Sequence, residues 1–213
     1  MRGDNCSYNL PLFVVFEGID GSGKSTLCNM TYEYYNAMSV PVVKLAEPTN
    51  GIWGNKIRKL LSGSTMPDAH EQLKLFLLDR EEDVRRNILP ALTNCKLIIM
   101  DRYYYSNIAY QGVSDISPES ILTQNIEMGF PKPNRVYLID IDPEESLKRI
   151  VKRNIYNSHD IFERKPFLEK VRKLYLSFTD DSFFIIDGRK TVEESFQCII
   201  NDINKSIKLL ILG

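Results

Sequence analysis

Residues 13–26 read FVVFEGIDGSGKST, and this segment predicts a strand, a phosphate-binding loop and the start of a helix. The pattern G-x-x-x-x-G-K-[ST] runs from Gly18 to Ser25, directly after an apolar run. Glycines let backbone N–H groups converge on phosphate oxygens, and a helix N-terminus adds partial positive charge. The alternative, a glycine-rich turn with an exposed lysine, is disfavoured by the strand before the loop and the helix after it. The segment therefore predicts a nucleoside triphosphate site.

We expect ATP to be held by the loop and the first residues of the helix, which are Gly18, Ile19, Asp20, Gly21, Ser22, Gly23, Lys24, Ser25 and Thr26. In this pattern the lysine reaches the β- and γ-phosphates, and the hydroxyl of Ser25 is a ligand of Mg²⁺. A second expected Mg²⁺ ligand is Asp101, because Leu97–Asp101 is an apolar strand that ends in a carboxylate.

The length and composition predict one domain in the cytoplasm. A chain of 213 residues, of which 43% are hydrophobic, is long enough to bury a core. Its 27 basic residues balance 28 acidic ones, which disfavours a protein that coats nucleic acid. The four cysteines stand apart and there are two histidines, so neither a disulfide framework nor a structural zinc site is expected. We recognise no signal peptide or membrane span, and expect neither membrane nor nucleic acid among the partners.

Five short apolar runs predict the strands of a parallel sheet. They are Leu12–Glu17, Val42–Ala46, Leu97–Asp101, Val136–Asp140 and Phe183–Asp187. Their apolarity is continuous rather than alternating, which is typical of strands covered on both faces.

Helical segments separate these runs. We expect helices over Lys24–Met38 and Asp68–Leu92, and further helix starts at Asp142 and Thr191, each of which is followed three residues later by glutamate. The alternation predicts a doubly wound α/β fold. Ligands of such folds bind at the carboxyl ends of the strands, where Glu17, Glu47, Asp101 and Asp140 stand.

A second group of polar and aromatic residues follows the strand that ends at Asp101. Residues 101–112 read DRYYYSNIAYQG, a mixture that suits an aromatic base bearing a phosphate, although a solvated loop with core tyrosines remains an alternative. On the preceding long helix, Phe76 and Arg80 are four residues apart and share a face. A phenylalanine at helical spacing is more often a core residue, so these two positions alone leave the role of Phe76 open.

Together these segments resemble the thymidylate kinase family. The resemblance rests on FEGIDGSGKST at 16–26, EPT at 47–49, LFLLDR at 75–80 and DRYYYSNIAYQG at 101–112. It implies a P-loop nucleoside monophosphate kinase fold, α/β, with a five-stranded parallel sheet and helices on both faces. It also implies transfer of the γ-phosphate of ATP to dTMP, giving dTDP and ADP for dTTP synthesis, by a homodimer. Residues 1–11 then form an N-terminal extension, and residues 12–213 one kinase domain with a lid at about 152–165.

The resemblance also implies roles for individual residues. The expected substrate-binding residues are Glu47, Arg58, Phe76, Arg80, Arg102, Ser106, Asn107, Tyr110, Gln111 and Glu163. Among them Phe76 stacks on thymine, Arg80 bonds the base, and Arg58 and Arg102 hold the monophosphate. Ser106 and Asn107 lie near the base edge, and Tyr110 flanks the sugar. The expected catalytic residues are Lys24, Asp20, Arg102 and Arg153.

Two departures from the family pattern concern arginines. The family often has an arginine before the Glu-Pro pair, where this chain has Ala46. Neither the P-loop nor the lid stretch 154–162 contains an arginine, so Arg153, which flanks the lid, is the expected replacement. The basic residues around the lid can equally be a solvated helix surface. Loss of one transition-state arginine can cost orders of magnitude in rate.

Two other classes of function stay open at this point. One is another P-loop phosphotransferase, such as a deoxynucleoside kinase, because the Asp101-Arg102 pair also resembles that pattern. The other is a nucleotide-dependent switch or a non-catalytic binding protein. A GTPase is disfavoured because no Asn-Lys-x-Asp segment is present, and an arginine on the acceptor side favours a monophosphate acceptor.

Overall fold

The computed structural model describes residues 11–61, 68–94, 96–152, 158–178 and 180–212. Its centre is a five-stranded parallel sheet in the order β2-β3-β1-β4-β5. The strands are β1 (Leu12–Glu17), β2 (Val42–Ala46), β3 (Leu97–Asp101), β4 (Arg135–Asp140) and β5 (Phe183–Asp187). The five apolar runs thus form the predicted sheet, and the predicted strand bounds differ from the observed ones only by Arg135 at the start of β4.

Helices connect these strands in the expected alternation. They are α1 (Lys24–Ala37), α2 (Ile52–Leu61), α3 (Ala69–Asp83), the π-helical turn η1 (Val84–Ile88), α4 (Leu89–Thr93), α5 (Tyr104–Gln111), α6 (Pro118–Glu127), α7 (Pro143–Lys152), α8 (Ser158–Leu176) and α9 (Val192–Leu212). The predicted capping box before α9 is present, because Thr191 and Glu194 exchange side-chain and backbone hydrogen bonds. None of the helices in the described ranges combines the length and apolarity needed to cross a bilayer.

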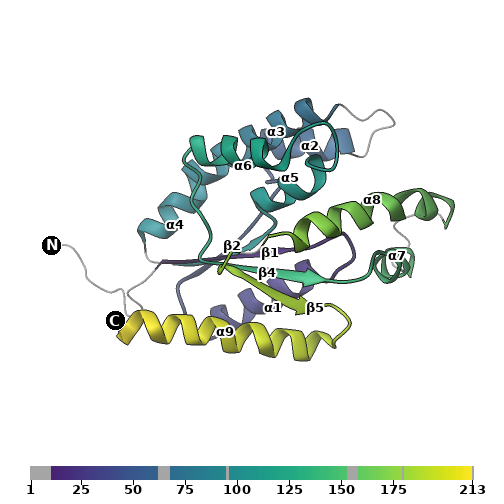
Figure 1. The fold of residues 1–213 in the computed structure, drawn as a ribbon. Helices are drawn as coiled ribbons and strands as arrows, with labels where there is room; N and C mark the ends of the chain where they lie inside the picture. The colour runs from purple at the N-terminus through teal and green to yellow at the C-terminus, as the bar shows by residue number, and fades with distance from the viewer. Residues whose placement is uncertain (1–10, 62–67, 95, 153–157, 179, 213) are drawn as a thin grey trace.

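Helices cover both faces of the sheet (Figure 1), and a hydrophobic core lies on each face. On one face, Leu27 and Tyr35 of α1 and Ile199 of α9 pack against alternate residues of the central strands. On the other face, helices α3 to α8 pack over the intervening strand residues, with Ile108 and Val171 among the buried contacts. Because both faces are covered, the strands carry apolar residues at almost every position, as the sequence predicts.

The segment expected as one helix over Asp68–Leu92 is instead three elements. Asp68 caps α3 as expected by accepting a hydrogen bond from the backbone N–H of Glu71 at 2.8 Å. The helix then widens into η1 and continues as α4. Pro90 gives the physical reason, because its ring lacks an N–H and would clash with the carbonyl four residues earlier in a regular α-helix. A π turn immediately before proline relieves that clash.

The topology gathers three acidic strand ends at one edge of the sheet. Residue Phe16 of β1 and residue Ala46 of β2 both pair with Asp101 of β3. Glu17 and Glu47 therefore follow on either side of Asp101, and the P-loop lies beside them. This is the edge at which doubly wound folds bind their ligands.

Candidate active site

The P-loop has the backbone geometry that its glycines predict. Gly18 has φ +143° and Gly23, the N-cap of α1, has φ +101°. A Cβ at Gly18 would lie 2.6 Å from the carbonyl oxygen of Ile139, which is closer than real Cβ atoms come. Residues other than glycine would therefore be strained or excluded here. The loop leads directly into α1, so the positive end of that helix faces the loop.

Lys24 is the buried cation of this loop. Its side chain is 7% exposed, and its Nζ lies 3.8 Å from the carboxylate of Asp20 and donates to the carbonyl of Ile19 at 3.4 Å. Burial, together with the nearby charge of Arg102, lowers the pKa of Lys24 to about 8. A phosphate bound beside it would therefore stabilise its protonated form.

The carboxylate of Asp101 fits a Mg²⁺ ligand. Its Oδ1 is buried and has no hydrogen-bond partner among the described residues. Ser25 is exposed in the first turn of α1, directly after the P-loop lysine. Carboxylate and hydroxyl oxygens, completed by phosphate oxygens and water, are the ligands that Mg²⁺ prefers. The donor set at these two positions is consistent with a nucleotide-bound Mg²⁺.

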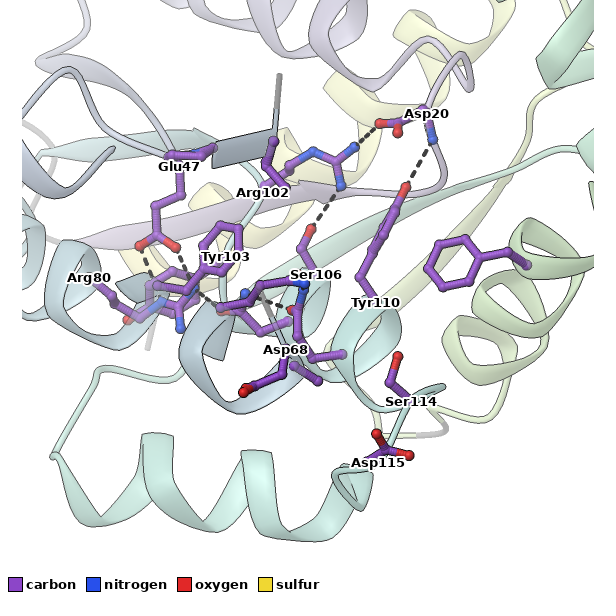
Figure 2. Close-up of a pocket in the computed structure, with 18 residues that line it drawn as sticks. Asp20, Glu47, Asp68, Arg80, Arg102, Tyr103, Ser106, Tyr110, Ser114 and Asp115 are labelled. Carbon is purple, nitrogen blue, oxygen red and sulfur yellow. Dashed lines mark hydrogen bonds and ion pairs between the residues drawn. The ribbon is translucent and has the colours of Figure 1, made fainter. Parts of the chain in front are cut away.

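A cleft of about 690 Å³ opens beside the P-loop. It is lined by Asp20, Glu47, Pro48, Leu61, Asp68, Ala69, Gln72, Phe76, Arg80, Arg102, Tyr103, Ser106, Asn107, Tyr110, Gln111, Ser114, Asp115 and Phe167. Figure 2 shows Asp20 and Arg102 at one end, with Asp68 and Asp115 at the opposite end. These residues come from the P-loop, the end of β2, α2, α3, the segment from Arg102 through α5, the α5–α6 connection and α8, and the fold brings them to one cavity.

Arg102 forms the cationic end of the cleft. Its backbone φ of +67° is a left-handed conformation that is rare for arginine. Its Nη1 donates to the hydroxyl of Ser106 at 3.0 Å, its Nη2 pairs with Asp20, and its guanidinium lies 5.3 Å from the ring centre of Tyr110. The Tyr110 hydroxyl accepts a hydrogen bond from the backbone N–H of Asp20 at 3.1 Å, which joins α5 to the P-loop.

Arg80 forms the inner wall of the cleft and is 1% exposed. Its Nε donates to Glu47 at 3.2 Å, and its Nη2 donates to the other oxygen of the same carboxylate. Its Nη1 donates to Asn125 of α6 at 2.8 Å, and the ring of Tyr103 lies 5.1 Å from its Cζ. Burial raises the pKa of Glu47, and the bidentate contact with the guanidinium opposes that rise.

A relay of amides continues from Arg80 along the cleft. Arginine only donates, so its 2.6 Å contact from Nη2 fixes the oxygen of Asn107 toward it. The Asn107 amide nitrogen then donates to Gln111 at 3.2 Å, and the Gln111 nitrogen donates to Gln72 at 3.2 Å. The amide nitrogens of Asn107 and Gln111 each have two N–H groups, and the relay uses one of each. This end of the cleft is therefore rich in donors and suits a base edge that presents carbonyl oxygens.

Phe76 and Ser106 are predicted substrate-binding residues that both line the cleft. Phe76 is half-buried and lines the cleft, so part of its side chain is accessible there. Ser106 and Asn107, both predicted near the base edge, both line the cleft. The Ser106 hydroxyl accepts from Arg102, and the Asn107 amide oxygen accepts from Arg80.

Arg58 is not among the residues that line the cleft. Its guanidinium donates to the carbonyl oxygen of Pro48 at 2.7 Å and to that of Thr49, and so anchors the loop after β2. Arg153 lies outside the described residues, and for Glu163 only its backbone position in α8 is described. Arg149 donates to the carbonyl of Gly188 at 3.0 Å.

Several cleft residues were not predicted from the sequence. They are Pro48, Leu61, Asp68, Ala69, Gln72, Tyr103, Ser114, Asp115 and Phe167. Gln72 carried a usable signal, because it precedes Phe76 by four residues and so shares its helix face. Phe167 and Asp115 carried none, since only the packing of α8 and of the α5–α6 connection brings them to the cleft.

Comparison with known proteins gives consistent matches. The family model described as Thymidylate kinase matches residues 16–199. A thymidylate kinase of Leptospira interrogans is 41% identical over 187 residues, which cover 88% of this chain and 91% of the relative. A probable thymidylate kinase of Archaeoglobus fulgidus is 39% identical over 86% of this chain and 90% of its own. A thymidylate kinase of Desulfotalea psychrophila is 34% identical over 95% of this chain and 99% of its own.

Proposed function

The chain belongs to the thymidylate kinase family, and we propose on that premise that it transfers the γ-phosphate of ATP to dTMP, giving dTDP and ADP. The observation that carries the proposal is the cleft beside the P-loop. It combines a cationic end at Arg102 with a donor-rich end at Arg80 and Asn107. A phosphate and a keto-pyrimidine base have the complementary chemistry.

The P-loop and the cleft divide the work of phosphoryl transfer between them. The transferred group passes between two anions, so catalysis consists mainly of positioning and charge neutralisation. Lys24 places a positive charge at the phosphate side of the P-loop, and Arg102 holds the acceptor phosphate at the adjoining end of the cleft. Asp20 lies between them, 3.8 Å from the Lys24 ammonium and paired with Arg102. It thereby keeps the two cations in place until phosphates replace it as their partner.

Mg²⁺ is proposed as the metal of the reaction, held by Ser25 and, through its unpartnered oxygen, by Asp101. When bound, it neutralises charge on the β- and γ-phosphates. The protein supplies the oxygen ligands, of which Oδ1 of the half-buried Asp101 is shielded from solvent.

The acceptor base is proposed to stack on Phe76 and to bond Arg80, with Tyr110 beside the sugar. The donors of the relay favour carbonyl oxygens over the amino group of cytosine, because two donors facing each other leave both unpaired. Gln111 contributes as a member of that relay. Arg58 supports the acceptor site indirectly, through the loop that carries Glu47. Glu163 and Arg153 remain proposals for the lid.

The missing arginine before Glu47 has a consequence for the proposal. The residue at that position, Ala46, is exposed at the end of β2. Because its side chain is a methyl group, it supplies no positive charge. We infer that Lys24, Arg102 and, from the lid, Arg153 carry the neutralisation of the transferred group. We further propose that the chain works in the cytoplasm as a homodimer. The exposed apolar side chains of Leu122 and Ile126, one turn apart on α6, support a dimer contact.

The test is to follow the phosphate itself. The protein is incubated with Mg²⁺, dTMP and ATP labelled at the γ-phosphate, and the nucleotides are separated. The label is expected in dTDP, at a rate that falls to background without dTMP. Label that appears only as inorganic phosphate would contradict the proposal.

Light scattering of the same preparation tests the proposed homodimer. A single mass equal to that of the monomer would contradict it.

A further inference from the structure

A buried carboxylate lies behind the cationic end of the cleft. Glu17 ends β1 directly before the P-loop and is 0% exposed. It is not among the residues that line the cleft. A carboxylate removed from water needs hydrogen-bond donors, and the surrounding residues supply several. Their arrangement connects Glu17 with Arg102.

The first two donors are backbone N–H groups at the start of α5. Oε1 of Glu17 accepts from the N–H of Tyr103 at 2.8 Å and from that of Ser106 at 3.2 Å. These are the N-cap and third residues of the helix, in the first turn, where N–H groups need acceptors other than the regular helical ones. The N–H of Ser106 also donates to the carbonyl oxygen of Tyr103 at 3.0 Å. Glu17 therefore caps α5 from another element. Because Arg102 immediately precedes this turn with φ +67°, the cap also holds the strained backbone of Arg102.

The other two donors are hydroxyl groups. Oε2 of Glu17 accepts from the Ser106 hydroxyl at 2.6 Å and from the Tyr175 hydroxyl at 2.8 Å. Each hydroxyl has one proton, and both protons point at the carboxylate. The Ser106 oxygen is thus left with lone pairs, and it accepts from Nη1 of Arg102 at 3.0 Å. The charge of Glu17 sets the direction of this bond.

Tyr175 connects this group to α8. Its side chain is 1% exposed and does not line the cleft, so it does not touch a ligand there. Its hydroxyl also lies 3.0 Å from the Ser106 oxygen. Phe167, on the same helix, does line the cleft and lies 6.1 Å from Tyr110, measured between ring centres. The position of α8 is therefore linked to the cationic end of the cleft through both Tyr175 and Phe167.

We propose that Tyr175 is a positioning residue for the acceptor phosphate, acting through Glu17 and Ser106 on the guanidinium of Arg102. The inference rests on the proposed function, since it assigns the acceptor phosphate to Arg102. Burial raises the pKa of Glu17, and the hydrogen bond from the Tyr175 hydroxyl opposes that rise and so favours the ionised carboxylate. The carboxylate in turn accepts the proton of the Ser106 hydroxyl, which leaves the Ser106 oxygen as an acceptor for Arg102. Without the Tyr175 hydroxyl, the hydrogen bond between Ser106 and the guanidinium of Arg102 is no longer fixed in this direction.

The test compares two tyrosines that differ in location only. Tyr175→Phe removes the hydroxyl and keeps the ring. Tyr137→Phe makes the same change at another fully buried tyrosine, whose hydroxyl donates to Asp202 at 2.7 Å on the opposite face of the sheet. We measure the Kd of dTMP by calorimetry without ATP, and the KM of dTMP and of ATP with Mg²⁺.

Tyr175→Phe is expected to raise both dTMP constants about tenfold, the loss of one hydrogen bond to a charged group, with the KM of ATP changed less than about twofold. Tyr137→Phe is expected to change none of the three beyond about twofold, while it lowers the melting temperature. Equal effects of the two variants on dTMP binding, or wild-type dTMP binding by a folded Tyr175→Phe, would overturn the inference.

A mutant cycle gives a second, independent measurement. Because Tyr175 and Ser106 act on one oxygen of Glu17, the double variant with Ser106→Ala should lose no more dTMP affinity than the weaker-binding single variant. Effects that multiply would overturn the inference. If Tyr175→Phe does not fold, Glu17→Gln is the variant to measure, because its amide N–H group would face the donors that now bond the carboxylate. Unchanged dTMP affinity of Glu17→Gln would again overturn the inference. A wild-type protein that binds dTMP without phosphorylating it would contradict the proposed function and leave this test intact.

Discussion

Replacement of Arg102 by alanine should affect the binding of the acceptor, dTMP, differently from the binding of ATP. The guanidinium lies at the end of the cleft nearest the P-loop, with its side chain 19% exposed. A guanidinium has five N–H donors, more than its contacts with Ser106 and Asp20 use, so it can also hold a phosphate in a bidentate contact. We expect Arg102→Ala to weaken dTMP binding far more than ATP binding.

The expected magnitude follows from the contacts that are lost. Two hydrogen bonds between charged groups, at the lower end of their usual range, contribute about 3 kcal/mol. That corresponds to a KM for dTMP raised roughly 100-fold. Asp20 also remains near the phosphate without its arginine, which adds repulsion to the loss. Arg102→Lys keeps the charge without the fork and should fall between wild type and Arg102→Ala.

The assay is steady-state ADP release with dTMP and ATP varied in turn. Arg86→Ala is the control, because Arg86 is 64% exposed, pairs with Glu82 and lies outside the cleft lining. We expect the control to change the KM of dTMP less than about twofold. If Arg102→Ala raises the two KM values equally, Arg102 does not hold the acceptor, and the assignment of the cationic end is refuted.

Three further predictions concern Lys24, Phe76 and Arg58. Since burial lowers the pKa of Lys24 to about 8, kcat/KM for ATP should fall as the pH rises through that value and the lysine loses its charge; a flat profile to high pH would contradict this. Phe76→Ala should lose about 1–3 kcal/mol of dTMP binding, measured by calorimetry, whereas Phe76→Trp keeps a stacking surface; a loss of folding without a selective loss of dTMP affinity would return Phe76 to the core. Arg58→Ala should lower stability to denaturant by about 2 kcal/mol through the loop carbonyls that it bonds, with a smaller rise in the KM of dTMP than Arg102→Ala gives; the reverse order would place Arg58 at the phosphate.

Much of the fold follows from local sequence patterns. Runs such as Leu97–Asp101 are apolar at nearly every position because both faces of the sheet are covered, and this pattern sufficed for all five strands. The π-helical turn in the long helix was missed, although Pro90 was visible, because a proline shows that a helix is disturbed and not how its backbone adjusts. Helix α6 was also not predicted.

The candidate site can likewise be predicted from the sequence only in part. The P-loop is a local motif, so its backbone could be predicted from residues 18–25 alone. The relay from Arg80 to Gln72 joins side chains of α3 and α5, and its hydrogen-bond directions are set by Arg80, which Glu47 holds from a third element. Tyr175 is separated from Glu17 by 158 residues, and no spacing in the sequence connects them. Such contacts depend on how whole helices and strands pack together, which local sequence patterns do not reveal.

The most direct measurement is ADP release from ATP and Mg²⁺ against a panel of dTMP, dUMP, dCMP, AMP, GMP and thymidine. We predict turnover mainly with dTMP and a lower rate with dUMP, because the cleft has donors for a keto-pyrimidine and an arginine for its phosphate. Release with dCMP at the rate of dTMP would contradict the role of the donors. Turnover with thymidine alone, or no turnover with any acceptor while ATP still binds, would contradict the central claim that this chain is a dTMP kinase.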